Sequence, residues 1–253
     1  MLSYTISGSL DKPPLLFLHG FLGAKEDWEE TIHHLKETFC CYAVDLPGHG
    51  TSPYEPHLLE SLFSTYLSLK LPPCPLVGYS MGGRLALFLK KLFPTCFTQL
   101  ILLGTHPGLQ DELSKKQRLL QDLNWVEMIE TQDFDTFLNA WYGQALFQSL
   151  RNNEALFQRI LLRRSKQNRN ALADILRNFS LGLQPTLTEF SADTLFVHGA
   201  DDLKFKELYQ NLPAHVKVAS VIHAGHTIPL ENPQGCADHI QQFLEVNSTL
   251  YNF

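Results

Sequence analysis

One short stretch restricts the fold of this chain more than any other. Residues 75–77 form an apolar run typical of a buried strand, and Gly78-Tyr79-Ser80-Met81-Gly82 follows it directly. A helical segment then begins near residue 85. A serine between two glycines, at a sharp turn from strand to helix, has its hydroxyl lifted above the end of the strand. Glycine is needed there because a Cβ would clash with the crowded backbone of the turn. The stretch therefore predicts a reactive Ser80 at the edge of a sheet.

Short apolar runs recur along the chain and alternate with segments of helical spacing. The runs lie at residues 15–18, 40–44, 75–77, 100–103, 194–197 and 217–222, and helical spacing marks residues 28–38, 58–71 and the segment after Pro233. Runs that are apolar throughout are typical of strands buried on both faces. Strands that alternate with helices favour right-handed crossovers and a parallel sheet. We therefore expect the α/β class, with a mostly parallel twisted sheet flanked by helices.

The alternation of predicted strands and helices stops after residue 106. Only helical patterning follows, at residues 117–129, 134–141, 153–165 and 171–178, before a strand resumes at residue 194. So much helix between two strands of one sheet indicates an insertion. We expect a core made of residues 1–106 and 186–253, with residues 107–185 forming a helical cap over one end of the sheet.

Composition excludes several classes of protein. Of 253 residues, 44% are hydrophobic and 18% charged, as in an ordinary globular protein. The net charge of −6, without any run of Lys or Arg, argues against nucleic acid or an anionic membrane as partner. No apolar run approaches the ~20 residues that cross a bilayer, so we expect no membrane insertion.

The cysteines and the first residues indicate the compartment. Five cysteines, an odd number without C-x-x-C spacing, predict buried thiols and neither a disulfide framework nor a metal site. Residues 1–4 lack the charged and apolar regions of a secretory signal. We expect a cytoplasmic protein that holds no metal.

Ser80 requires partners before it can react. A serine hydroxyl becomes nucleophilic or basic when a histidine takes its proton and an acid fixes that histidine's tautomer. Asp201 and Asp202 follow the strand near residue 197, and His226 follows the last strand, next to a flexible Gly225. Loops after parallel strands share one edge of the sheet, so these side chains can converge. Spacing alone does not separate Asp202 from Asp201.

Other histidines are weaker candidates for the base. His198 and His223 also end strands, and His19 ends the strand at residues 15–18. We expect His198 and His223 to pack at the strand ends and His19 to support the loop that follows it.

Taken together, these motifs resemble those of a known family of proteins. The chain resembles α/β-hydrolase-fold proteins over nearly its full length, and more narrowly the 2-succinyl-6-hydroxy-2,4-cyclohexadiene-1-carboxylate (SHCHC) synthases of menaquinone biosynthesis. The matching words are His19-Gly20-Phe21-Leu22-Gly23, Gly78-Tyr79-Ser80-Met81-Gly82-Gly83-Arg84-Leu85-Ala86-Leu87, His106-Pro107-Gly108-Leu109, Trp141-Tyr142, Ala224-Gly225-His226 and Glu231-Asn232-Pro233. Arg84, Tyr79 and the His-Pro-Gly-Leu word are the most particular to the synthases. The family's Gly-x-x-Asp-x-Lys-Phe word, matched by residues 199–205, selects Asp202 over Asp201.

The resemblance implies a reaction without metal or organic cofactor. The synthases eliminate pyruvate from 2-succinyl-5-enolpyruvyl-6-hydroxy-3-cyclohexene-1-carboxylate. By this resemblance Ser80, activated by His226 and Asp202, is the base that removes a proton next to the succinyl ketone. The main-chain N–H groups of Phe21 and Met81 would form the oxyanion hole.

Arginines support an anionic substrate. Arg84 lies one helical turn after Ser80, so its guanidinium can reach the same pocket and bind a carboxylate through two hydrogen bonds. Arg118 and Arg164 fall where the synthases place two further carboxylate-binding arginines. The resemblance adds Tyr79 and Trp141 to the substrate site. We expect a small polycarboxylate as partner, and a monomer or weak homo-oligomer.

Two other functions fit parts of the pattern. A serine carboxylesterase or thioesterase of the same fold would use Ser80 to attack an acyl carbon, and fold alone does not separate it from a lyase. A non-catalytic binding protein is disfavoured, because it would not need all three members of the triad in their proper loops.

Overall fold

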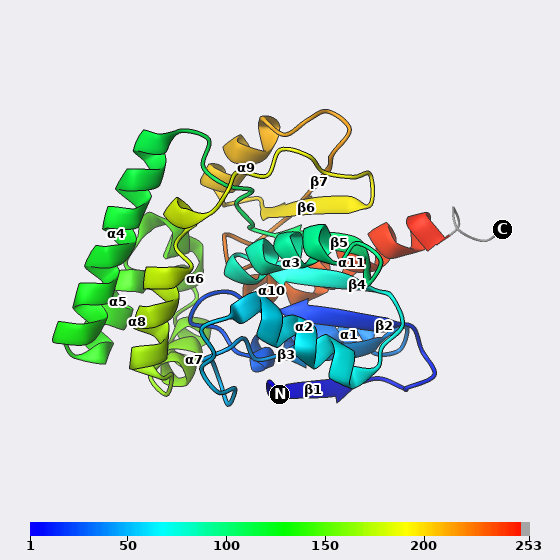
Figure 1. The fold of residues 1–253 in the computed structure, drawn as a ribbon, viewed down its shortest axis with the longest axis horizontal. Coiled ribbons are helices and arrows are strands. Elements are labelled where there is room, and N and C mark those ends of the chain that lie inside the picture. Colours follow the sequence, from blue (N-terminus) through cyan, green and yellow to red (C-terminus); the bar gives the residue numbers. More distant parts are fainter. Residues whose placement is uncertain (249–253) are drawn as a thin grey trace.

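The computed structural model describes residues 1–248, and its centre is a seven-stranded sheet (Figure 1). The strands are β1 (Tyr4–Ser7), β2 (Pro14–Leu18), β3 (Cys40–Val44), β4 (Cys74–Tyr79), β5 (Phe97–Leu103), β6 (Thr194–Gly199) and β7 (Lys217–Val221). Their order across the sheet is β1-β3-β2-β4-β5-β6-β7. Only β1 is antiparallel to its neighbour, so the expected mostly parallel sheet is confirmed.

Alternate residues of the central strands enter two separate cores. Leu16 and Leu18 of β2 pack into one core with the helices α2 (Leu58–Leu69) and α3 (Met81–Leu92). Leu15 and Phe17 pack into the other core with α1 (Glu29–Leu35) and α11 (Pro233–Ser248). The side chains of a strand alternate between faces, and helices cover both faces here. This explains why the sequence of β2 is apolar throughout.

Two layers of helices flank the sheet. On one side lie the short 3₁₀ turn η1 (Lys25–Trp28), α1 (Glu29–Leu35), α10 (Ile228–Glu231) and α11 (Pro233–Ser248); on the other lie α2 (Leu58–Leu69), α3 (Met81–Leu92) and α9 (Leu203–Gln210). The sheet, lying between the two layers, directs its parallel strands toward one common edge.

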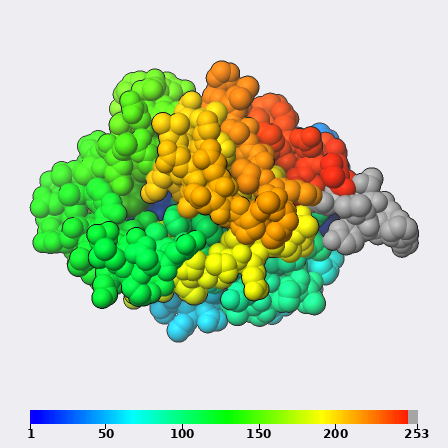
Figure 2. All heavy atoms as spheres, turned by 90° about the horizontal axis from the view of Figure 1, so that it is seen from above, coloured from blue at the N-terminus to red at the C-terminus, as the bar shows by residue number. Residues whose placement is uncertain are grey.

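Between β5 and β6 the described chain is helical. The elements are α4 (Glu112–Thr131), α5 (Phe134–Tyr142), η2 (Ala145–Phe147), α6 (Gln148–Asn152), α7 (Glu154–Arg164), α8 (Arg169–Asn178) and η3 (Leu181–Leu183). They lie to one side of the sheet, and all of them except η3 contribute side chains to a third apolar core. In Figure 2 the green atoms of these helices meet the gold atoms around α9. We propose that residues 107–185 act as a cap on this end of the core.

Several helix ends differ from the expected ones. α4 begins at Glu112, five residues before the expected start, because the Asp111 side chain accepts a hydrogen bond from Ser114 N–H (2.8 Å) and caps the helix. α6 and α9 were not expected. α9 begins directly after Asp202. Only Phe205 and Tyr209 of this helix are fully buried, with Leu208 partly buried beside them, which is a weak periodic signal.

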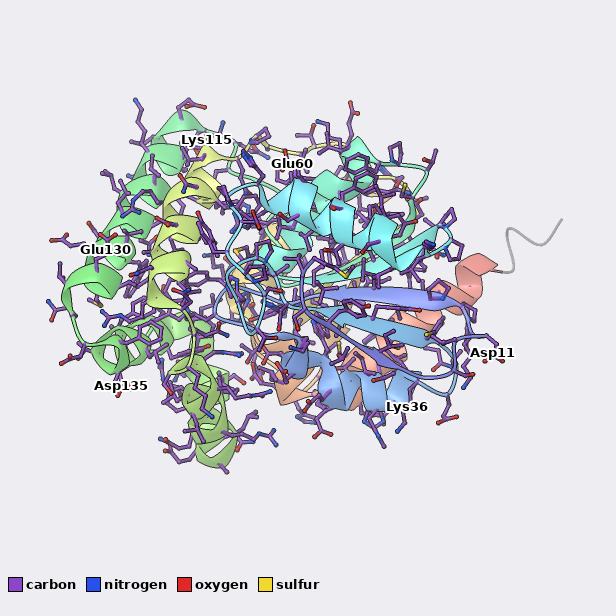
Figure 3. The ribbon with its side chains drawn as sticks, turned by 60° about the horizontal axis from the view of Figure 1, so that its bottom comes forward. Asp11, Lys36, Glu60, Lys115, Glu130 and Asp135 are labelled. Atoms are coloured by element: carbon purple, nitrogen blue, oxygen red, sulfur yellow. The ribbon has the colours of Figure 1, made fainter. Side chains whose placement is uncertain are left out.

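The surface is charged, and the thiols lie inside. Charged side chains such as Glu130 and Asp135 of the cap point outward in Figure 3. Four of the five cysteines are buried and Cys96 is half-buried. Within residues 1–248 no helix has both the length and the apolar character needed to cross a membrane.

Candidate active site

Ser80 lies at the turn between β4 and α3 in a strained conformation. Its φ of 51° and ψ of −109° are unusual for a residue with a side chain. The turn is tight: a Cβ on Gly78 would lie 2.5 Å from Gly83 Cα, and one on Gly82 would lie 2.3 Å from the His19 carbonyl oxygen. Ser80 N–H donates to the Leu103 carbonyl oxygen (2.8 Å), which ties the turn to the neighbouring strand. This geometry presents the hydroxyl to the pocket.

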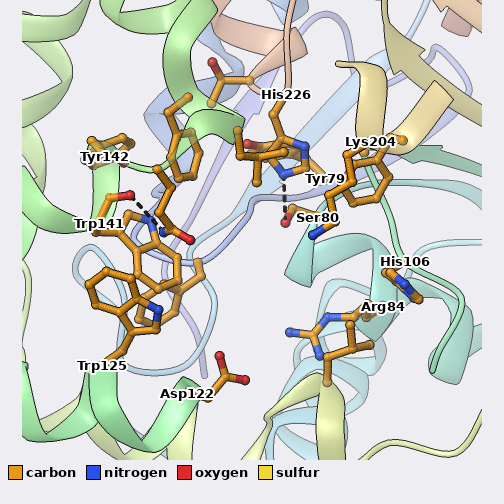
Figure 4. Close-up of a pocket in the computed structure, with 18 of the residues that line it drawn as sticks. Tyr79, Ser80, Arg84, His106, Asp122, Trp125, Trp141, Tyr142, Lys204 and His226 are labelled. Atoms are coloured by element: carbon orange, nitrogen blue, oxygen red, sulfur yellow. Dashed lines mark hydrogen bonds between the residues drawn. The ribbon is translucent and has the colours of Figure 1, made fainter. Parts of the chain in front are cut away.

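His226 connects Ser80 to Asp202. His226 Nε2 lies 3.4 Å from Ser80 Oγ, and Nδ1 lies 2.8 Å from Asp202 Oδ2 (Figure 4). A carboxylate only accepts, so Nδ1 carries the proton and Nε2 offers a lone pair to the serine. Asp202 also accepts a hydrogen bond from Phe205 N–H (3.2 Å), which orients the carboxylate. The arrangement can remove the proton of Ser80.

The rival side chains lie elsewhere. Asp201 is exposed, although it directly precedes Asp202. His19 Nε2 accepts a hydrogen bond from Leu46 N–H (2.9 Å), and His198 is buried. His223, which we expected to pack at the end of its strand, is instead exposed, and it adopts a left-handed conformation (φ 54°) in the turn beyond β7.

The loop that carries His226 is held by a residue that the sequence analysis did not select. Glu231 accepts hydrogen bonds from Gly225 N–H and Thr227 N–H, both at 2.9 Å, so one carboxylate fixes the residues on either side of His226. The ring of Phe205 lies 4.8 Å from the imidazole. The only signal for Glu231 in the sequence was its place in the Glu-Asn-Pro word.

Two main-chain N–H groups are available near Ser80. Met81 is the first residue of α3, where an N–H has no partner within the helix and the helix dipole is positive. Phe21 lies in the loop after β2, and within residues 1–248 its N–H meets no hydrogen-bond acceptor. Both residues thus have donors suited to a negatively charged oxygen.

Arg84 enters the same pocket without an acidic partner. Among the described residues no carboxylate lies within 4.0 Å of its guanidinium, which donates to the Phe179 carbonyl oxygen (3.2 Å) and lies 5.0 Å from the Phe179 ring. Burial, together with nearby Arg118, lowers the pKa of Arg84 to about 9. A half-buried cation without a counterion is poised for an anionic ligand.

Two further cations and a histidine line the pocket beside Arg84. Arg118 lies 2.9 Å from both oxygens of Asp122 through Nε, and Lys204 and His106 complete this wall. Burial and the neighbouring cations Lys204, Arg118 and Arg84 lower the pKa of His106 to about 4, so His106 is neutral near pH 7. Sequence analysis missed Lys204 and His106 as pocket residues, although both lie in words that matched the synthases.

The remaining expected residues surround the pocket on the cap side and beneath it. Trp141 packs against Phe21 (ring centroids 5.0 Å apart) and faces Arg84 across the cavity. Tyr79 is buried beside His226 (5.4 Å). Arg164 also borders the pocket, but its guanidinium is already bound to Asp27 through Nη1 (3.0 Å) and Nη2 (2.6 Å). Although burial opposes its charge, the Asp27 carboxylate raises the pKa of Arg164.

No cluster of three or more His, Cys, Asp or Glu side chains among residues 1–248 is arranged to hold a metal ion.

The fold and this site define the class of protein. The family model described as alpha/beta hydrolase fold matches residues 13–233, so the chain belongs to that family. Solved structures that share only the fold include a thermophilic esterase from Thermogutta terrifontis, with a TM-score of 0.79 and 20% identity over 96% of this chain and 93% of that one.

Nearer relatives narrow the assignment. The 2-succinyl-6-hydroxy-2,4-cyclohexadiene-1-carboxylate synthase of Salmonella arizonae is 34% identical over 94% of this chain and 96% of that protein. The synthase of Salmonella typhimurium is 33% identical over the same shares. The structure of MenH from S. aureus matches with a TM-score of 0.90 and 27% identity, over 98% of this chain and 100% of that one. The chain belongs to the family of SHCHC synthases.

Proposed function

We propose that this protein is a carbon–oxygen lyase that eliminates pyruvate from 2-succinyl-5-enolpyruvyl-6-hydroxy-3-cyclohexene-1-carboxylate to form SHCHC. Family membership and an intact Ser80–His226–Asp202 arrangement support the proposal. In this reaction Ser80, with His226 as proton acceptor, removes the proton next to the succinyl ketone. The N–H groups of Phe21 and Met81 hold the enolate oxygen. The enolate then expels the enolpyruvyl oxygen, and protonation of that leaving group gives pyruvate.

The observation that carries the proposal is Arg84. Its guanidinium lies in the pocket of Ser80 with no carboxylate partner among the described residues, beside Arg118 and Lys204. A neutral ester would leave that cation unpaired, whereas a substrate with several carboxylates would pair it. We therefore assign a small polycarboxylate as substrate, with Arg84 and Arg118 among its ligands and Tyr79 and Trp141 in the substrate pocket. Arg164 binds this substrate through donors that Asp27 does not use. Formation of a biosynthetic intermediate of this kind fits a cytoplasmic protein.

A direct assay tests the reaction. Purified protein is given the enolpyruvyl substrate, and pyruvate release is followed with a lactate dehydrogenase coupling enzyme. A panel of neutral p-nitrophenyl esters is measured alongside. Rapid pyruvate release with slow ester hydrolysis is expected. Rapid ester hydrolysis without any pyruvate would overturn the proposal and establish the serine esterase that the same triad could also support.

A further inference from the structure

A side chain of the cap, Gln167, is bonded directly to the loop that carries Phe21. Gln167 lies between α7 and α8 and is only 9% exposed. Its Nε2 donates to the carbonyl oxygens of Gly23 (2.8 Å) and Leu22 (3.3 Å). These bonds join residues about 145 positions apart in the chain. The cap therefore contacts the oxyanion loop, defined here as residues 20–24, through polar bonds as well as apolar packing.

The orientation of the Gln167 amide is fixed by its partners. Oε1 accepts a hydrogen bond from Gly50 N–H (2.9 Å), on a second loop of the core. Only an amide oxygen can accept from Gly50, and only an amide NH₂ can donate to two carbonyls. All three partners are main-chain groups, so changes in their side chains would not break this bridge. Gln167 links the cap to two core loops at once.

The bridge acts at a strained residue. Leu22 adopts φ 65°, a left-handed conformation that is unfavourable for a leucine and persists only where surrounding contacts hold it. Its N–H donates to His49 Nε2 (3.3 Å), its carbonyl accepts from Gln167, and its side chain is completely buried in the core of the cap. The residue directly after Phe21 is thus held by the cap at both its carbonyl and its side chain.

We propose that Gln167 is a positioning residue that aims the N–H of Phe21 at the developing oxyanion by holding Leu22 in its strained conformation. The inference rests on the proposed function only in assigning Phe21 as an oxyanion donor. Without the bridge, the peptide between Phe21 and Leu22 relaxes, and Phe21 N–H moves away from the reacting oxygen. The cap then contributes to the rate of the chemical step in addition to enclosing the substrate.

The test compares three variants with the wild type. Gln167→Ala removes the amide, and Gln167→Met removes its hydrogen bonds while keeping most of its volume. Gln158→Ala is the matched control, because Gln158 is an exposed glutamine on cap helix α7 whose side-chain amide donates to Glu154 on the same helix. For each protein kcat and KM are measured for pyruvate release and for a neutral p-nitrophenyl ester. Amide hydrogen exchange is followed by mass spectrometry in the peptide covering residues 19–28.

Removing a whole oxyanion donor lowers kcat by about 10²–10³-fold, so a misdirected donor should lower it by roughly 10-fold or more. We expect this loss in both Gln167 variants, on both substrates, with KM within about two-fold of the wild type. Exchange should become faster in residues 19–28 and stay unchanged around Ser80 and His226. The Gln158→Ala protein should match the wild type.

Either arm can overturn the inference. If kcat in both Gln167 variants equals that of Gln158→Ala, or if exchange in residues 19–28 is unchanged, Gln167 does not position Phe21. A lower melting temperature without a loss of kcat would give Gln167 a structural role only. If the wild type releases no pyruvate, the proposed reaction fails, while ester turnover still decides the role of Gln167. If no ester is turned over either, the exchange measurement decides it.

Discussion

Arg164 of cap helix α7 and Asp27 of the core turn η1 form a two-point ion pair, with Nη1–Oδ1 at 3.0 Å and Nη2–Oδ2 at 2.6 Å. Both side chains are almost completely buried. The Tyr142 hydroxyl accepts a hydrogen bond from Arg164 Nε (3.1 Å). Asp27 also accepts from Ala24 N–H (3.3 Å) at the end of the oxyanion loop. The cap is therefore fastened to the core beside the reactive serine.

The ion pair between Asp27 and Arg164 predicts how the free energy of unfolding changes in single and double variants. Removing Asp27 leaves the buried charge of Arg164 uncompensated, and about 3–5 kcal/mol of unfolding free energy should be lost in Asp27→Ala. Arg164→Ala should lose less, because Arg163 Nη1 still lies 3.7 Å from Asp27 Oδ1. The double variant should lose much less than the sum of the two, because neither charge is then left alone. Urea unfolding of the four proteins measures this coupling. Additive losses would show that the two residues do not stabilise each other.

Ser80→Ala should abolish turnover and leave the fold intact. The hydroxyl faces the pocket and contributes little packing, whereas the reaction depends on it, so kcat should fall on the order of 10³-fold or more. Steady-state kinetics and circular dichroism of the purified variant test this. A folded Ser80→Ala protein with nearly normal activity would contradict the role given to the serine.

Asp202→Asn should reduce kcat far more than Asp201→Asn. An amide at position 202 can still cap α9, so the fold should persist, but it no longer stabilises the protonated His226 and allows the wrong tautomer. We expect a loss on the order of 10³–10⁴-fold for Asp202→Asn. Asp201 is exposed, and its substitution should change kcat by less than about two-fold. A larger loss of kcat in Asp201→Asn would assign the catalytic carboxylate to Asp201 instead of Asp202.

Arg84 should matter for a polycarboxylate and hardly at all for a neutral ester. Arg84→Ala should remove roughly 2–5 kcal/mol of transition-state binding, as expected when a buried charge loses its partner. Arg84→Lys should restore part of it, since an ammonium keeps the charge but loses the two-point geometry. The quantity to measure is kcat/KM on both substrates for the three proteins. Equal losses on both would make Arg84 a structural support of α3.

The buried side chains of His49 and His19 should make the folded protein less stable at acidic pH. Burial, and then the neighbouring His19, hold the pKa of His49 well below its ordinary value, and burial also lowers the pKa of His19. Below a pH of about 6.5 the unfolded chain binds protons that the folded chain does not, so the free energy of unfolding falls as the pH decreases. Above that pH both states are neutral and this contribution is constant.

Replacing His49 isolates this effect. His49→Gln keeps an acceptor for Leu22 N–H and removes the titration, which should flatten the loss of stability between pH 7 and 5 by up to about 1.4 kcal/mol per pH unit. Urea unfolding of both proteins across this range gives the slopes. Parallel curves for variant and wild type would show that His49 is protonated equally in the two states.

Features set by neighbours in the chain could be predicted from the sequence. The expected strand at residues 40–44 coincides with β3, and Pro233 begins α11 as expected. Apolar runs and proline are local signals, and they act before distant contacts exist. The turn at Ser80 follows from Gly78 and Gly82 in the same way. The synthase resemblance, carried by words such as the one around Arg84, added the family.

The contacts between the cap and the core were settled only by the tertiary structure. Gln167 gave no signal as a partner of Leu22, nor Asp27 as the partner of Arg164, because these residues are more than 130 positions apart. Hydrogen bonds and ion pairs form only within a few ångströms, and no local pattern reports which distant groups will meet. The sequence by itself thus determined a parallel sheet with a reactive serine at its edge. The folded chain decided that Asp27 engages Arg164, while Arg84 is left with no carboxylate partner among the described residues.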